Sequence, residues 1–264
     1  MNDTKKEIRD HISVLKKQMT LMHTEMSIIQ QKISELDFSQ TTTHSTEKHI
    51  EEVVLVLFDF ETTGLGKTSD ICITEVGAIH VDPFKGHILH EFRELVQPTV
   101  HVTAGASRVN GLTDRKLSSF PMWDNVGSKF NSWLESLREN KDTLIYLCAH
   151  NGKRYDSRLL IFEHSRHQLK LPRNLYHIDT LPLFKSMFIG LDSYSLSALY
   201  KYMFDDKIKD AHTALGDVKA MLRLLEVGLM VGEHVLEKWI KAHSESFDSV
   251  QKRCYGVKML QEMT

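Results

Sequence analysis

Phe58-Asp59-Phe60-Glu61-Thr62-Thr63-Gly64 ends a continuous apolar run, residues 53–58 (VVLVLF). Such a run is typical of a strand that is covered on both faces in a layered α/β domain. Alternate strand residues point to the same face, so Asp59 and Glu61 can reach one ion cluster. Phe58 and Phe60 then point the other way, into packing. The stretch therefore predicts a pair of carboxylates at the end of a buried strand, where active sites of open α/β sheets commonly lie.

Further strands and helices are predicted downstream of this stretch. We expect strands at residues 71–81, 88–96, 144–149 and 176–179, with a turn at residues 82–86. We expect helices at residues 122–138, 157–169, 193–204, 213–227 and 231–242. Strands come first and then alternate with helices, which predicts an α/β fold with a mixed sheet flanked by helices.

The N-terminal segment, residues 1–38, is predicted to be one amphipathic helix. Its apolar residues are alternately four and three apart for about four heptads, as in a coiled coil; they are Ile8, Ile12, Leu15, Met19, Met22, Met26, Ile29, Ile33 and Leu36. We expect this seam to make the protein a homo-oligomer, with a dimer as the simplest case. A second row, Val14, Leu21 and Ile28, keeps open the alternative that the helix lies on the globular domain.

The remaining domain boundaries follow from composition. Residues 39–48 (SQTTTHSTEK) are polar and without periodicity, so residues 39–51 are predicted to be a linker. The main domain is expected at residues 52–246, followed by a C-terminal tail at residues 247–264.

Composition excludes several classes of protein. The chain has 264 residues, 41% of them hydrophobic, which is enough for one full domain plus an appendage. The net charge of −2 gives no basic excess that would by itself indicate nucleic-acid binding. Its 3 cysteines have neither metal-ligand nor disulfide spacing. Because no signal peptide or membrane span is visible, we expect an intracellular protein, cytoplasmic or nuclear, with no membrane partner.

Two further acids and a histidine complete the candidate site. Asp156 follows the strand at residues 144–149 and falls in the first turn of the next helix, where it would otherwise be read as a simple helix N-terminal charge. Asp217 and His212 are five residues apart, which on one helix would separate them by about 140°. We therefore expect the helix to begin at about Thr213, an acceptable cap residue, with His212 on the preceding loop.

Four carboxylates in one place would repel one another without a counter-ion. Oxygen ligands suit Mg²⁺ or Mn²⁺, and two such ions about 4 Å apart would clamp a scissile phosphate. Asp59, Glu61, Asp156 and Asp217 are therefore the candidate metal ligands. His212 is the candidate base for the attacking water, because its ordinary pKa is near neutrality.

These residues resemble a known family. The order Asp-x-Glu, Asp, His-x4-Asp resembles that of the DEDDh 3′→5′ exonucleases, whose fold is ribonuclease H-like. The chain is most similar to the three-prime repair exonucleases. The stretches that carry the resemblance are residues 58–65 (FDFETTGL), 106–112 (ASRVNGL), 149–156 (AHNGKRYD) and 211–218 (AHTALGDV). It covers roughly residues 52–242 and does not include the N-terminal helix.

The resemblance assigns roles to individual residues. It implies that Asp59, Glu61, Asp156 and Asp217 bind two Mg²⁺ ions and that His212 is the general base. It also implies contacts with the substrate, which are a wedge from Leu65 near the terminal base, contacts from Thr62 and Tyr155 to the terminal nucleotide, and a backbone contact from Arg154. For Leu65 and Tyr155, the alternative is plain packing in the fold.

The function that follows is a metal-dependent 3′→5′ exonuclease. It would hydrolyse phosphodiester bonds at DNA 3′ ends, with single strands preferred, and release nucleoside 5′-monophosphates. Two alternatives remain open, a 3′→5′ exoribonuclease and a non-catalytic oligomeric module that binds nucleic acid. The first depends on how the pocket treats a 2′-OH, on which the sequence is silent.

Overall fold

The computed structural model describes residues 53–83, 85–188, 190–228, 239–240 and 242–260. The chain divides into two compact units, Met1–His49 and Ile50–Thr264. The predicted coiled coil at residues 1–38 and the predicted linker at residues 39–51 lie outside the described residues, as does most of the helix predicted at residues 231–242.

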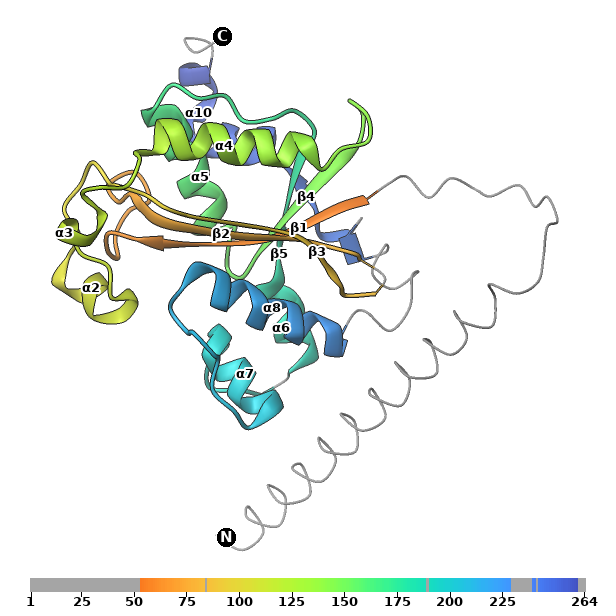
Figure 1. Cartoon of the computed structure of the whole chain (residues 1–264). Coiled ribbons are helices and arrows are strands. Elements are labelled where there is room, and N and C mark those ends of the chain that lie inside the picture. The colour runs from red at the N-terminus through yellow and green to blue at the C-terminus, as the bar shows by residue number, and fades with distance from the viewer. Residues whose placement is uncertain (1–52, 84, 189, 229–238, 241, 261–264) are drawn as a thin grey trace, which may run out of the picture. The chain divides into compact units, whose positions relative to one another are not determined.

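A six-stranded mixed sheet forms the centre of the second unit, with the strand order β3-β2-β1-β4-β5-β6 (Figure 1). Its strands are β1 (Val53–Thr62), β2 (Ile73–Val81), β3 (Ile88–Leu95), β4 (Leu144–Ala149), β5 (Leu175–Asp179) and β6 (Glu245–Ser246). β1, β4 and β5 run parallel, whereas β2, β3 and β6 pair antiparallel with their neighbours. The predicted α/β class and mixed sheet are therefore confirmed.

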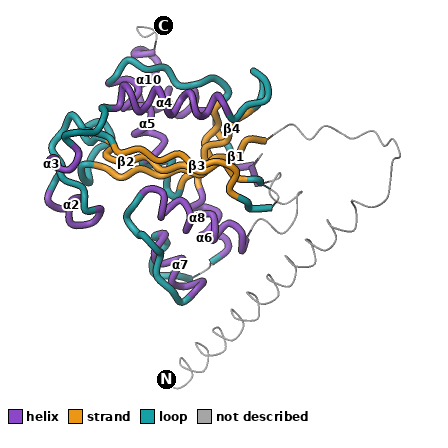
Figure 2. Tube along the Cα trace, viewed as in Figure 1, coloured by secondary structure: helices purple, strands orange, loops and turns teal. Residues whose placement is uncertain are grey.

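Helices cover both faces of this sheet (Figure 2). On one face lie α4 (Trp123–Ser136), α5 (Asp156–Arg166) and α10 (Phe247–Leu260). On the other face lie α6 (Thr180–Met187), α7 (Leu196–Phe204) and α8 (Ala214–Gly228). The short helices α2 (Ala104–Asn110) and α3 (Asp114–Leu117) lie near the end of β1. None of the described helices has the length and apolar character that crossing a membrane requires.

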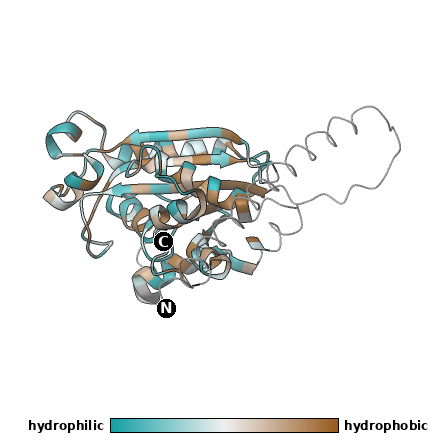
Figure 3. Cartoon of the chain, turned by 90° about the horizontal axis from the view of Figure 1, so that it is seen from below, coloured by the Kyte–Doolittle hydropathy of each residue, from teal (hydrophilic) through white to brown (hydrophobic). Residues whose placement is uncertain are grey.

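Side-chain alternation along β1 builds both hydrophobic layers. Val54 and Val56 pack into the layer of α4, α5 and α10, whereas Leu55 and Leu57 pack into the layer of α6, α7 and α8. In Figure 3 the helices carry both hydrophobic and hydrophilic residues, as expected of helices with one face on a core. Continuing the alternation past Phe58 places Asp59 and Glu61 on the side of α8.

Some predicted boundaries move, and the reasons are local. α5 ends at Arg166 rather than 169, close to Gln168 in the left-handed conformation at φ 55°. α7 begins at Leu196 because the Ser195 hydroxyl caps it by accepting from the Ala198 N–H at 3.3 Å. The segment expected as a C-terminal tail begins with α10, whose Phe247 and Val250 are buried in the core.

Candidate active site

The end of β1 extends past its partner β4. Pairing between these parallel strands stops at Leu57 and Cys148, so Asp59 and Glu61 lie where β4 no longer covers the edge of β1. On the other edge, Asp59 pairs with Gly77 of β2. Two carboxylates are thereby held on a strand that is fixed on one side and open on the other.

Gly77 lets α8 approach the sheet closely. A Cβ atom added to Gly77 would lie 2.4 Å from the backbone nitrogen of Leu215, in the first turn of α8. The backbone of the helix therefore rests directly on the β2 strand at the position that pairs with Asp59. This contact brings Asp217, also in the first turn of α8, to the carboxylates of β1.

Asp59, Glu61 and Asp217 form one group, in which each residue offers an oxygen and all these oxygens lie within 4.8 Å of one another. All three side chains are half-buried. Within the described part of the chain, no other set of three or more histidines, cysteines or acids brings its ligand atoms this close together. The oxygens come from two segments far apart in the sequence, so the fold creates the cluster rather than local sequence.

Asp156 lies next to this group but does not belong to it. It is the first residue of α5, as expected, and is buried at 7% exposure. Burial raises its pKa to about 7, although its own backbone N–H and that of Phe60 hydrogen-bond the carboxylate and act in the opposite direction. The Phe60 N–H belongs to the part of β1 beyond its pairing with β4, so Asp156 replaces β4 there.

The electrostatics of the cluster are unfavourable without a cation. Burial, then the charges of Asp156 and Asp217, raise the pKa of Asp59 well above its ordinary value. Burial raises the pKa of Glu61 to about 8, against a hydrogen bond from Asn110. Burial also raises the pKa of Asp217, while the charge and backbone N–H of His212 partly offset the shift. Together these acids would repel one another if all were ionised near neutral pH.

Glu75 is a fifth acid at the site, which the sequence analysis missed. It is the cross-strand partner of Glu61 and is 2% exposed. The Nε of Arg93 donates to its carboxylate at 2.7 Å, and its charge raises the pKa of Asp59, Glu61 and Asp217. The sequence contained one sign of it, a single acid inside the apolar strand ITEVGAIHV. An acid is rarely buried without a partner, so Glu75 could have been marked as a candidate site residue.

His212 lies on the loop before α8, as expected. α8 begins at Ala214, and the Thr213 hydroxyl caps it by accepting from the Gly216 N–H at 3.1 Å. His212 is exposed and has a left-handed backbone with φ 62°. Its backbone N–H hydrogen-bonds the Asp217 carboxylate, so the histidine and the aspartate are joined although they do not share a helix.

The four residues expected at the substrate lie close in the sequence to Glu61 or to Asp156. Thr62 ends β1 and donates from its hydroxyl to the Gly64 carbonyl at 3.0 Å. Leu65 is 95% exposed, so it has no packing role in the described fold. Tyr155 is half-buried, and the exposed Arg154 places its guanidinium 5.6 Å from the centre of the Tyr155 ring.

Asp179 holds the loop that leads to Arg154 and Tyr155. One of its carboxylate oxygens accepts from the backbone N–H of Asn151 at 2.9 Å, and the other accepts from that of Lys153 at 3.1 Å. The first oxygen also accepts from the Leu181 N–H and so caps α6. Because Asp179 ends β5, the sheet itself fixes the path of the chain into Asp156.

His150 is a different kind of histidine from His212. Its Nε2 donates to the Tyr194 carbonyl at 2.8 Å, and its Nδ1 lies 2.9 Å from the Thr180 hydroxyl. Burial lowers its pKa. Both nitrogens are thus engaged in tying the end of β4 to α6 and to the segment before α7, which indicates a structural role.

Asn110 connects α2 to the same site and was also missed. Its amide hydrogen-bonds the Glu61 carboxylate and donates to the Thr62 carbonyl at 3.4 Å. The neighbouring Val109 is 56% exposed. Asn110 lies in the stretch ASRVNGL, but the sequence alone does not show that this stretch contacts the end of β1.

Comparison with known proteins identifies a family. The model of the Exonuclease family (RNase_T) matches residues 56–225. The chain is 29% identical over 201 residues to DNA polymerase III PolC-type of Bacillus cereus, covering 76% of this chain and 13% of that protein. It is 26% identical over 230 residues to Three-prime repair exonuclease 1 of Homo sapiens, covering 77% of this chain and 71% of that protein.

Solved structures show the same fold. The zinc-bound complex of E. coli exonuclease I with single-stranded DNA superposes with a TM-score of 0.58 at 16% identity, covering 73% of this chain and 43% of that one. The chain thus spans only a small part of the polymerase and less than half of exonuclease I. The family match covers well over half of this chain, and the chain therefore belongs to the RNase_T exonuclease family, within the DEDDh superfamily of ribonuclease H-like fold.

Proposed function

We propose that this chain is a 3′→5′ exonuclease that removes nucleotides from DNA 3′ ends with the help of two divalent cations. The observation that carries the proposal is the group of Asp59, Glu61 and Asp217, whose carboxylate oxygens lie within 4.8 Å of one another. Membership of the exonuclease family supports a hydrolase. The names of two similar proteins, a three-prime repair exonuclease and exonuclease I bound to single-stranded DNA, support the substrate and the direction.

The side chains fit a hard divalent cation. The donor atoms are all carboxylate oxygens, which suit Mg²⁺ or Mn²⁺. Within the described ranges, no Lys or Arg forms an ion pair with Asp59, Glu61 or Asp217. Burial and the charges of neighbouring acids raise the pKa of Asp59 and of Glu61, and a bound cation would oppose both shifts. Asp156, next to Asp59, would complete the ligand set for a second cation.

Bound Mg²⁺ would supply two things here, a lowered pKa for a water molecule and stabilisation of charge on the leaving oxygen. The chain supplies the rest. The exposed imidazole of His212, anchored through its backbone to Asp217, accepts the proton of the attacking water. The water oxygen forms a bond to phosphorus and the bond from phosphorus to the 3′ oxygen breaks. That oxygen takes a proton from solvent, giving a shortened strand and a nucleoside 5′-monophosphate.

Residues around the acids would position the strand end. The exposed Leu65 would wedge against the terminal base, which explains a large apolar side chain that is 95% exposed. Thr62 and Tyr155 would contact the terminal nucleotide, and Arg154 would contact the sugar-phosphate backbone. A single strand reaches such a site without unpairing, which is why single-stranded DNA is the expected substrate.

The test is hydrolysis of a 5′-labelled oligonucleotide in three forms: single-stranded DNA, duplex DNA and RNA. With Mg²⁺, single-stranded DNA should give a ladder of successively shorter labelled products, and EDTA should abolish it. Immediate release of a labelled mononucleotide would indicate the opposite polarity. Faster cleavage of RNA would establish the exoribonuclease instead. The absence of cleavage of any substrate with Mg²⁺ or Mn²⁺ would favour the non-catalytic binding module.

A further inference from the structure

A groove lies between the β1–β2 loop, which follows the strand that carries Asp59 and Glu61, and helices α5 and α10. Its cavity volume is about 580 Å³, within the range of ligand-binding pockets. Lys67 lines it from the loop, Arg154, Tyr155 and Arg158 from the start of α5, and Cys254 and Tyr255 from α10. We refer to this feature as the basic groove. Tyr155 directly precedes Asp156 in the chain, so part of the lining adjoins a candidate metal ligand.

The charge of the basic groove has one sign. Lys67, Arg154 and Arg158 line it, and no acid is among the described residues that do so. None of the three cations forms an ion pair with a carboxylate in the described ranges. The adjoining hollow of about 400 Å³ shares Arg154 and Arg158 with the groove, but it is also lined by Asp179, and its Lys153 and Arg253 are both paired with Glu245. A chain of net charge −2 thus keeps three uncompensated cations together in one groove.

Arg158 carries a donor that the protein does not use. Its Nε is buried and has no hydrogen-bond partner among the described residues. Its guanidinium also hydrogen-bonds the Cys254 thiol, a weak partner for a charged group. An unmade hydrogen bond from a buried charged group is costly. Arg158 also lines the groove, and its guanidinium is suited to planar recognition of phosphate.

Aromatic rings accompany these cations. The Tyr155 ring lies under the guanidinium of Arg154. Phe162 and Tyr255 also line the groove, and their rings meet edge-on with their centroids 5.3 Å apart. Alternating cations and aromatic rings is the arrangement by which proteins bind single-stranded nucleic acid, through phosphate contacts and base stacking.

We propose that the basic groove binds the strand behind its 3′-terminal nucleotide. Lys67 and Arg158 contact the phosphates of the next nucleotides, while the ring of Tyr255 offers a stacking surface to their bases. This inference rests on the proposed exonuclease function, because it assigns the continuation of the same substrate. It also explains how a nearly neutral chain retains a polyanion, since the positive charge is local.

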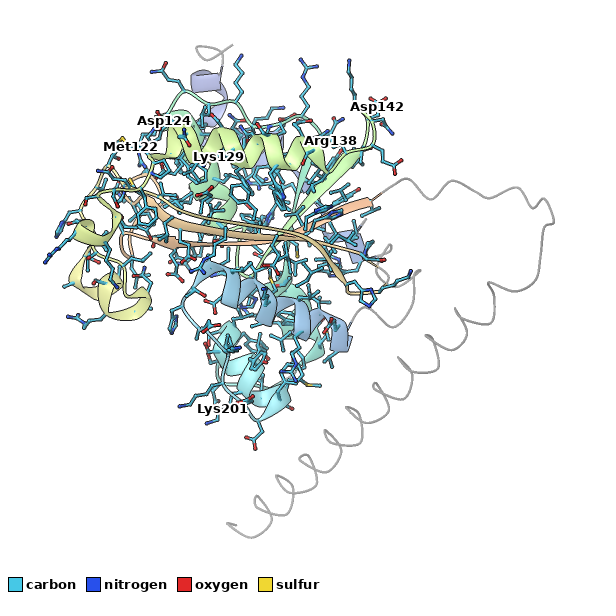
Figure 4. All side chains as sticks on the ribbon, viewed as in Figure 1. Met122, Asp124, Lys129, Arg138, Asp142 and Lys201 are labelled. Atoms are coloured by element: carbon cyan, nitrogen blue, oxygen red, sulfur yellow. The ribbon has the colours of Figure 1, made fainter. Side chains whose placement is uncertain are left out.

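The test compares Lys67→Ala and Arg158→Gln with Lys141→Ala as a matched control. Lys141 is an exposed cation that lines neither of these hollows, next to Asp142 in the turn between α4 and β4 (Figure 4). That turn lies at the opposite end of β4 from the loop with Arg154. KM and kcat are measured on a dinucleotide and on a 12-nucleotide single strand over a range of salt concentrations.

Each groove variant should raise KM for the 12-mer by about fivefold or more, with kcat little changed. Its KM for the 12-mer should also depend less on salt, with a logarithmic slope smaller by about 0.7 for each phosphate that the variant no longer neutralises. KM for the dinucleotide, whose only phosphate is the scissile one, should change less than twofold. Equal effects on both substrates, or 12-mer values like those of Lys141→Ala, would overturn the proposal.

Failure of the groove and failure of the enzyme can be told apart. Fluorescence anisotropy with a labelled 12-mer in EDTA measures binding without hydrolysis. If the parent hydrolyses nothing, the proposed function fails. The groove is then tested by anisotropy alone, in which the two variants should bind the 12-mer more weakly than the parent, and equal binding would contradict the proposal. Thermal unfolding of each variant shows whether it is folded. Lys67 is exposed, so its variant keeps the test valid even if Arg158→Gln unfolds.

Discussion

Asp217 shows how single residues combine two demands at this site. Its carboxylate is grouped with those of Asp59 and Glu61 and accepts from the His212 backbone. Burial raises its pKa, so its ionised form is held in an environment that disfavours it. The proposed metal role and the stability of the fold therefore make opposite predictions for its removal.

We predict that Asp217→Asn lowers the rate of DNA hydrolysis by about 100-fold or more, because the proposed metal site then lacks one of its ligands. In EDTA at pH 8, the variant should melt no lower than the parent, since one of several crowded negative charges is gone. Hydrolysis assays and thermal unfolding check the two parts. A large drop in melting temperature would mean that Asp217 is mainly a structural residue.

For His212 the informative change is to asparagine, which tolerates the left-handed backbone at φ 62° and cannot act as a base near neutral pH. We predict that His212→Asn lowers kcat by about 10²- to 10⁴-fold. The rise in melting temperature on adding Mg²⁺ should match that of the parent. His87→Asn, on the exposed turn before β3, is the control. An unchanged kcat would show that the proton goes elsewhere.

The positions of individual site residues could be predicted from the sequence where their spacing along the chain alone decides the geometry. The two-residue spacing of Asp59 and Glu61 sufficed to predict carboxylates on one face, and the helix geometry around Thr213 sufficed to place His212 on a loop. Glu75 and Asn110 were missed for a physical reason. Each reaches the site through tertiary pairing, across the β1–β2 ladder or from a separate helix, and spacing along the chain carries no record of either contact.

Among the elements, α8 and β2 decide whether the acids meet. Their backbones touch at Gly77, where any Cβ would lie 2.4 Å from the Leu215 nitrogen and 2.5 Å from the Ala214 carbonyl carbon. Backbone atoms of a capped helix start cannot move aside as a flexible side chain could. A single absent side chain on β2 therefore sets the distance between α8 and β1.

We predict that Gly77→Ala displaces the start of α8, reducing hydrolysis on the order of 100-fold through misplacement of Asp217. It should also destabilise the fold by about 1–3 kcal/mol through overpacking. Kinetics and denaturant unfolding measure the two effects. Gly105→Ala in α2 is the matched control, because the nearest atom to its Cβ is 3.8 Å away. Full activity in Gly77→Ala would contradict the proposed coupling between packing and the site.

Helices and strands could be predicted where their apolar sequence patterns extend over many residues. The buried strands and the amphipathic α4 and α8 have apolar patterns that span whole elements. α2, α3 and α6 are short, and each depends on a side-chain cap from Thr103, Thr113 or Asp179 rather than on periodicity. A few residues give too little pattern to separate such a turn of helix from a loop.

For the whole molecule, the acid cluster links stability to pH and to metal. The folded-state pKa values of Glu61 and Asp156, about 8 and about 7, lie above their ordinary values of 4.5 and 3.8. The protein therefore holds protons in the folded state that the unfolded chain releases. Stability from these groups is full below about pH 4 and is lost as the pH rises through 7 and 8.

We predict that in EDTA the melting temperature falls between pH 5 and pH 8. Mg²⁺ should raise it more at pH 8 than at pH 5, because cation binding requires the ionised acids. At a free Mg²⁺ concentration of about 100 times Kd, the gain is about 2.7 kcal/mol. Thermal unfolding at both pH values, with and without Mg²⁺, is the measurement. A metal-free protein that becomes more stable towards pH 8 would contradict the assigned pKa directions.

We also propose that residues 1–38 assemble the protein as a coiled coil, on the heptad pattern of the sequence. Deleting residues 1–48 should then lower the number of copies per particle measured by light scattering and leave hydrolysis per chain unchanged, since the described site is built within the second unit. The same number of copies before and after truncation would show that the heptads serve another purpose.

In β1, hydrophobic packing and the acidic side chains depend on the same alternation of the backbone. Inserting or deleting one residue ahead of Asp59 would exchange the two sets of side chains, turning the acids towards Trp123 and the phenylalanines towards α8. Length changes in this strand are thus tolerable only in steps of two residues. Natural variants of the protein should therefore differ in length within its loops, while each residue of β1 keeps pointing to the same face of the sheet.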